Sequence, residues 1–180
     1  MDATDVIKGR RSVRKYKDQV VDRALMQEIL DLTRFAPSWI NFQVARWTLI
    51  DNPDVIKTLA TDGVREFSYN MNTLENAKGV AILSFVKGKS GSMENYNMES
   101  HNIDKWEVFD AGIACQTFCL SAFSKGIGTC IFGVINESQI AKIIDLPAEE
   151  TVAALIVYGY PEGDTPAPAR KEVSEISRFI

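Results

Sequence analysis

Residues 8–16 of this chain read Lys-Gly-Arg-Arg-Ser-Val-Arg-Lys-Tyr. Six cations fall between Lys8 and Lys17, and Ser12 lies between two of the arginines. A guanidinium pairs with phosphate through two parallel hydrogen bonds, and a serine hydroxyl or a free backbone N–H can complete the contact. Charge runs are also often no more than solvated surface. The segment alone therefore leaves two interpretations open, a basic surface turn and a local anion site.

The composition predicts one globular domain that spans residues 1–180. With 180 residues, 46% of them hydrophobic and 24% charged, the chain is long enough for a sizeable core. A net charge of -4 and a pI near 5.1 argue against a nucleic acid or an anionic membrane as the main partner, because both need a broad basic face. The sequence has no signal-like first segment and no apolar run of ~18 residues, so we expect a cytoplasmic protein without a membrane span.

The cysteines predict no metal site. Cys115, Cys119 and Cys130 are odd in number, lack the spacing of zinc ligands and have only His101 to join them. Free cysteine packs as a small hydrophobic residue, so we expect three buried thiols.

Hydrophobic periodicity predicts helices that alternate with short strands. The expected strands cover residues 46–51, 79–86, 126–133 and 151–160, the last of them as a central strand. Helix caps are expected at Thr4, Asp22, Asn52 and Asn136. The helix after Asp22 places Leu25, Ile29 and Leu32 on one face and stops at Pro37. A further helix runs toward residue 63, and residues 66–75 form a polar helix or turn.

The longest predicted helix covers residues 107–125 and ends at Gly126. Its apolar residues cover more than one face, so it lies either at the centre of the domain or in a subunit interface. Residues 87–105 are rich in Gly, Ser, Asn and Met and form a long loop, which is a lid, a link or a substrate-facing segment. The tail after residue 161 cannot pack alone, and its last apolar positions need a partner surface: Val173, Ile176, Phe179 and Ile180.

Four motifs occur in a specific order. They are R-R-S-V-R at residues 10–14, P-S-x-x-N-x-Q at residues 37–43, G-I-G-T at residues 126–129 and R-K at residues 170–171. Together they resemble the FMN-dependent nitroreductase family along essentially the whole chain. The resemblance implies an α+β fold with a mixed, mostly antiparallel central sheet flanked by helices. It also implies an intertwined homodimer that holds FMN at the subunit interface, with the tail of about residues 161–180 reaching over the partner.

The resemblance assigns residues to the flavin site. Arg10 and Ser12, with Arg170 or Lys171, would hold the FMN phosphate. The segment of Arg11 and Val13 would lie along the ribityl chain and the ring, and Arg14 near the pyrimidine edge. The ring would accept a hydrogen bond from Asn70. The other subunit would contribute Pro37, Ser38, Trp39 and Asn41, and the backbone of a last group would pass close to the flavin: Gly128, Thr129, Cys130 and Ile131.

Two positions depart from the family pattern. Thr73 lies where some members have a lysine near flavin N1 and O2, which leaves Arg14 as the cation for the charge that develops there. Residues 43–47 read Q-V-A-R-W, whereas the family usually reads Q-P-W followed by a basic residue and Phe. The second departure concerns the local packing rather than the flavin site.

The resemblance implies an enzyme in which NAD(P)H is the electron donor and FMN the bound cofactor. It would reduce nitro compounds, quinones or related small electron acceptors by a ping-pong mechanism, with Arg14 as the catalytic residue. The single His101 fits this chemistry, which needs no acid–base triad. Two other classes stay open. One is a flavin-binding or flavin-storing protein of the same fold without reductase activity, and the other is a dimeric interaction domain whose basic cluster binds another anion.

Overall fold

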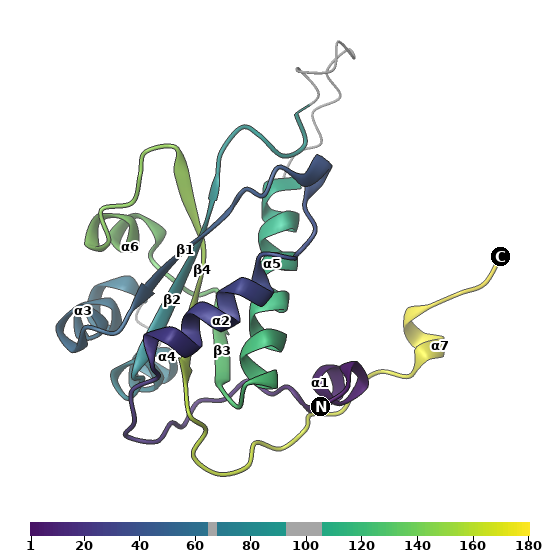
Figure 1. The fold of residues 1–180 in the computed structure, drawn as a ribbon, viewed down its shortest axis with the longest axis horizontal. Coiled ribbons are helices and arrows are strands. Elements are labelled where there is room, and N and C mark those ends of the chain that lie inside the picture. The colour runs from purple at the N-terminus through teal and green to yellow at the C-terminus, as the bar shows by residue number, and fades with distance from the viewer. Residues whose placement is uncertain (65–67, 93–105) are drawn as a thin grey trace.

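The computed structural model describes residues 1–64, 68–92 and 106–180, and its centre is an antiparallel sheet (Figure 1). The strands are β1 (Ala45–Ile50), β2 (Gly79–Val86), β3 (Gly128–Phe132) and β4 (Glu150–Gly159). They lie in the order β1-β2-β4-β3, and every pairing between these strands is antiparallel. An isolated bridge between Ser12 and Thr129 adds one short parallel pairing, outside the named strands. The four predicted strands and the mixed, mostly antiparallel α+β fold are confirmed.

Helices cover both faces of the sheet. They are α1 (Ala3–Gly9), α2 (Arg23–Thr33), α3 (Pro53–Thr58), α4 (Ser68–Glu75), α5 (Trp106–Ser124), α6 (Glu137–Ile143) and α7 (Val173–Ile176), with the short turns η1 (Trp39–Asn41) and η2 (Leu59–Gly63). In Figure 1, α2 and α5 lie on one side of the sheet and α3, α4 and α6 on the other. The tail runs away from the body of the chain to α7.

The continuous apolar run of β2 follows from burial on both faces. Successive side chains of a strand point to opposite sides of the sheet. Val80 and Ile82 pack with the core under α3, α4 and α6, whereas Ala81 and Leu83 pack with the core under α2 and α5. Two hydrophobic cores therefore share one sheet.

Three of the four predicted helix caps are confirmed, at Asp22, Asn52 and Asn136. The prediction of Thr4 is wrong. The Asp2 carboxylate accepts the N–H of Asp5 at 2.8 Å and caps α1, and Thr4 lies inside the helix. Asp2 has the extended backbone of a cap residue, and its side chain reaches the first turn as a threonine would.

The buried face of α2 is centred on other residues than the predicted face, which consisted of Leu25, Ile29 and Leu32. Met26 and Ile29 are buried, while Leu32 is 44% exposed at the margin of that face. The helix ends at Thr33, ahead of Pro37. The following predicted helix is regular from Pro53 to Thr58 and closes with the wider turn η2.

The long predicted helix is α5, and Gly126 with φ of 79° follows its end as expected. Cys115, Cys119 and Cys130 are buried free thiols, as predicted. In the described ranges no group of three or more His, Cys, Asp and Glu is placed to hold a metal ion. None of the described helices is long and apolar enough to cross a membrane. His101 and the start of the predicted segment 66–75 lie outside the described residues, as does most of the loop 87–105.

Replacing Gly79 by alanine should destabilise the protein by about 1–3 kcal/mol, because an added methyl group overpacks the sheet. A Cβ atom at Gly79 would lie 2.2 Å from a ring carbon of Tyr158, its buried cross-strand partner. Urea unfolding of Gly79→Ala and of the control Gly133→Ala measures the effect. At Gly133 a Cβ meets no other atom within 4 Å. Equal unfolding midpoints for the two variants would contradict this account of the packing.

Candidate functional site

The two ends of the chain meet around a cavity of about 670 Å³, which we call the arginine cavity. Five of the residues assigned to the flavin site line it, together with one aromatic residue and the first part of the tail. The lining residues are Arg10, Arg11, Ser12, Arg14, Lys15, Tyr69, Glu162, Asp164, Thr165, Pro166, Ala167, Pro168 and Arg170. Lys171, the alternative to Arg170, is exposed and is not among them.

Strand β3 fixes the arginine segment. The N–H of Val13 donates to the carbonyl of Thr129 at 2.9 Å. Gly128 leaves the room this contact needs, because a Cβ there would lie 2.7 Å from the Val13 side chain. Within one chain, the side chain of Val13 therefore occupies the space beside Gly128. Thr129 and Cys130 are buried beneath the segment, and Ile131 is 46% exposed.

The tail is held against the same segment. Lys17 N–H donates to the carbonyl of Tyr160 at 2.9 Å, and Glu162 N–H donates to the carbonyl of Lys15 at 3.0 Å. These bonds start the tail antiparallel to the arginine segment, and the Pro-rich stretch that follows carries Arg170 to the cavity.

The cavity carries an excess of positive charge, with five cations against two carboxylates. The guanidinium of Arg11 donates to the carbonyl of Lys8 at 2.6 Å, and that of Arg170 to the carbonyl of Pro168 at 3.1 Å. None of the lining cations forms an ion pair with a described carboxylate. Guanidinium groups gathered in excess and without ion pairs favour an anion between them.

Arg10 and Arg11 are the half-buried members of this group. No acceptor for the Arg10 guanidinium lies among the described residues. Hydrogen bonds from Cys115 and Thr129, with the charge of Arg10, lower the pKa of the Cys119 thiol against the opposing effect of burial. The Arg10 charge therefore lies at the wall of the cavity, near Cys119, which is buried within α5.

Arg14 lies over the ring of Tyr69, 5.6 Å from its centroid, and donates to the carbonyl of Ser12 at 3.2 Å. Asp18, a possible surface partner for Arg14, pairs instead with Lys78 at 2.7 Å. Thr73 is buried and donates to the carbonyl of Tyr69 within α4, so it offers the cavity no charge.

The remaining predicted residues form a second group on residues 37–43, here called the 37–43 loop. Within one chain it lies at the other end of α5, where Trp39 packs edge-on against Trp106 with ring centroids 4.7 Å apart. At that end Asp110 contacts the loop, and at the opposite end Phe123 packs against Gly9. At 1.5 Å per residue the two positions are about 20 Å apart along the helix. One chain therefore does not bring the two groups together.

Comparison with known proteins identifies the family of this chain. The model of the nitroreductase family matches residues 7–160. The chain belongs to the nitroreductase family. A relative from Bacillus subtilis, YdgI, described as a candidate NAD(P)H nitroreductase, is 40% identical over 87% of this chain and 86% of its own length.

Solved structures of nitroreductases share the fold. The family protein from Streptococcus pneumoniae aligns with a TM-score of 0.83 at 16% identity, covering 99% of this chain and 100% of that one. A protein from Exiguobacterium sibiricum, described as a candidate nitroreductase in complex with FMN, aligns with a TM-score of 0.81 at 18% identity. That alignment covers 99% of this chain and 97% of the other. At these identities the likeness shows the fold.

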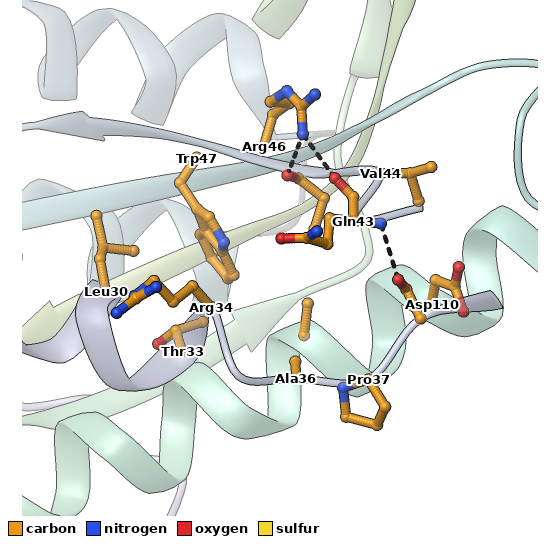
Figure 2. Close-up of a pocket in the computed structure, with 13 residues that line it drawn as sticks. Leu30, Thr33, Arg34, Ala36, Pro37, Gln43, Val44, Arg46, Trp47 and Asp110 are labelled. Atoms are coloured by element: carbon orange, nitrogen blue, oxygen red, sulfur yellow. Dashed lines mark hydrogen bonds between the residues drawn. The ribbon is translucent and has the colours of Figure 1, made fainter. Parts of the chain in front are cut away.

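At residues 43–47, where the chain departs from the nitroreductase pattern, side chains pack against the core and a cavity lies beside them. Val44 is buried, and Trp47 stacks on Phe118 with ring centroids 4.7 Å apart. The cavity of about 290 Å³ lies between α2, β1 and α5 with Ala45 in its lining, and Figure 2 shows Trp47 on one of its walls. Across its rim Arg46 donates to the carbonyl of Gln43 at 2.8 Å (Figure 2).

Two further residues of this nitroreductase were not predicted from the sequence. Tyr69 lines the arginine cavity beside the buried Asn70. Its position next to Asn70, a predicted site residue, is the sequence signal that could have marked it. Asp110 is 3% exposed and contacts the 37–43 loop. An acidic residue in a mostly apolar helix was the signal for it, since carboxylates are seldom buried without a role.

Proposed function

We propose that this protein is an FMN-dependent oxidoreductase that uses NAD(P)H to reduce nitro compounds, quinones or related small electron acceptors by a ping-pong mechanism. The observation that supports it most is the half-buried Arg10 guanidinium, which has no described partner and faces a cavity with an excess of cations. A phosphate is the anion that such a site fits best. Membership of the nitroreductase family supplies the reaction class.

The residues present fit FMN. Arg10, Ser12 and Arg170 would hold the phosphate, and Arg11 with Val13 would lie along the ribityl chain. Arg14 and Asn70 would face the ring, with residues 128–131 behind it. When bound, FMN accepts a hydride equivalent from the nicotinamide and supplies electrons to the acceptor, while the protein binds, orients and tunes it.

We also propose a homodimer, because one chain separates the two groups of site residues. The face of α5 that points away from the sheet is open, with Val108 and Phe109 more than half exposed. The tail exposes Val173 and Phe179 as well. A second chain placed against these surfaces would bring its 37–43 loop to the arginine cavity, and the tail, about residues 161–180, would reach over the partner. The three free thiols fit a reducing, cytoplasmic location.

Turnover tests the proposed reaction. We expect oxidation of NAD(P)H that depends on added quinone or nitroaromatic compound and on FMN. Protein that holds FMN but oxidises neither NADH nor NADPH with any such acceptor would favour a flavin-binding or flavin-storing protein of this fold.

Arg14→Gln should keep FMN but lower the two-electron reduction potential of the bound flavin by some tens of millivolts. For a two-electron couple, each ~30 mV corresponds to ~1.4 kcal/mol of stabilisation of the reduced flavin. The positive charge of Arg14 at the ring edge favours the more negative, reduced state. Lys15→Gln removes the same charge from the same cavity and is the control. The potentials of both variants and the wild type are measured side by side. A potential for Arg14→Gln equal to that of the wild type, with equal rates of reduction, would leave Arg14 without this role.

A further inference from the structure

Helix α5 buries a carboxylate that the proposed mechanism does not use. Asp110 is 3% exposed in the second turn of the helix. No described lysine or arginine forms an ion pair with it. A buried carboxylate is unfavourable unless hydrogen bonds replace the water it has lost. The groups that donate to Asp110 therefore indicate what it does.

Asp110 joins two segments that are far apart in the sequence. The N–H of Trp39, in the 37–43 loop, lies 3.1 Å from each of its carboxylate oxygens. The hydroxyl of Ser90, just after β2, donates to Oδ2 at 2.5 Å. One turn earlier, Glu107 accepts the N–H groups of Gly88 and Lys89. The first two turns of α5 thus hold both segments through carboxylates.

The 37–43 loop has a backbone that its sequence does not favour. Ile40, Asn41 and Gln43 adopt left-handed conformations, with φ of 45°, 58° and 50°. Asparagine tolerates this region, but for a β-branched residue such as Ile40 it is a genuine outlier. Strained backbone persists where surrounding contacts enforce it, and it concentrates at functional sites.

Contacts inside the loop do not attach it to the rest of the chain. Ser38 Oγ accepts the N–H of Gln43 at 2.8 Å, and Asn41 N–H donates to the carbonyl of Ser38 at 3.0 Å. These bonds close the loop on itself. Its polar attachment to α5 is the pair of bonds from Trp39 to Asp110, beside the packing of Trp39 on Trp106.

We infer that Asp110 is a positioning residue, which holds the 37–43 loop in the shape and place from which it completes the flavin site of the partner subunit. Its carboxylate fixes the Trp39 backbone, and Ser90 fixes the carboxylate. This inference rests on the proposed function and adds to it a residue that touches neither flavin nor substrate.

Asp110→Asn tests the inference, because the amide keeps the size of the side chain and removes the charge and one acceptor. We expect about tenfold weaker FMN binding. In the flavin-free protein we expect faster hydrogen exchange of the Trp39 amide with unchanged exchange in β4. Ser121→Ala is the control, because it removes a buried polar group from the same helix away from the loop. Ser90→Ala removes one hydrogen-bond donor to Asp110. It should weaken FMN binding and speed exchange of the Trp39 amide by less than Asp110→Asn does, and it replaces Asp110→Asn as the test if that variant does not fold.

Wild-type FMN affinity together with wild-type exchange at Trp39 would overturn the inference. So would a variant whose exchange rises equally in β4 and at Trp39, since that is general destabilisation. Failure of the wild-type protein to bind FMN would instead contradict the proposed function. In that case the exchange of the Trp39 amide still decides whether Asp110 holds the loop.

Discussion

Arg10→Ala should weaken FMN binding about ten- to a hundredfold while the protein stays folded. A charge-assisted hydrogen bond is worth roughly 1.5–3 kcal/mol, and each 1.4 kcal/mol is a factor of ten in affinity. The guanidinium of Arg10 is half-buried, lines the arginine cavity and has no described partner, so its removal breaks no contact that holds the fold.

Flavin titration, followed by fluorescence, measures this effect. Lys8→Ala is the matched control, since Lys8 belongs to the same cationic segment but is exposed and does not line the cavity. We expect its dissociation constant to stay within a factor of about two of the wild type. A dissociation constant for Arg10→Ala equal to that of Lys8→Ala would make the phosphate assignment wrong.

Gly112→Glu should convert the proposed dimer to monomers and release the flavin with it. Gly112 lies on the open face of α5, and a Cβ there meets no other atom of the chain within 4 Å. The substitution is therefore tolerated within one chain. Between two chains it would bury an unpaired carboxylate in an apolar contact, which costs several kcal/mol, or at least about a hundredfold in dimer affinity.

Light scattering with simultaneous absorbance detection measures mass and flavin content together. Gly133→Glu adds the same side chain at another glycine with free space, away from α5, and should leave a flavin-loaded dimer. A dimeric, flavin-loaded Gly112→Glu protein would contradict the placement of the interface on α5. A monomeric, flavin-loaded wild type would contradict the dimer itself.

Sequence patterns predicted the fold well where the signal is local. A continuous apolar run specifies the strand at residues 79–86. Side chains that accept N–H groups of the first turn specify the starts of three helices, at Asp22, Asn52 and Asn136. The cap of α1 was assigned to the wrong residue because Asp2 and Thr4 are both good caps within one turn. The left-handed backbone at Ile40 could not be foreseen, because it opposes the local preference of the residue and depends on contacts with α5.

The site could be predicted from the sequence only in part, for a geometric reason. The motif at residues 10–14 and Arg170 do meet around one cavity. A sequence motif does not show which of two chains contributes it to a site. The length of α5 shows that the 37–43 loop lies too far from the arginine cavity of the same chain. Asp110 was visible as an acidic residue in an apolar helix, but its link to Trp39 joins segments distant in sequence.

The visible spectrum of the purified protein shows whether the arginine cavity holds FMN that NAD(P)H reduces. We expect flavin absorption that is bleached by NAD(P)H without oxygen, and we expect denaturation to release FMN equimolar with the chain. A preparation that carries no flavin, takes up none from added FMN and is unchanged by both NADH and NADPH would contradict the account.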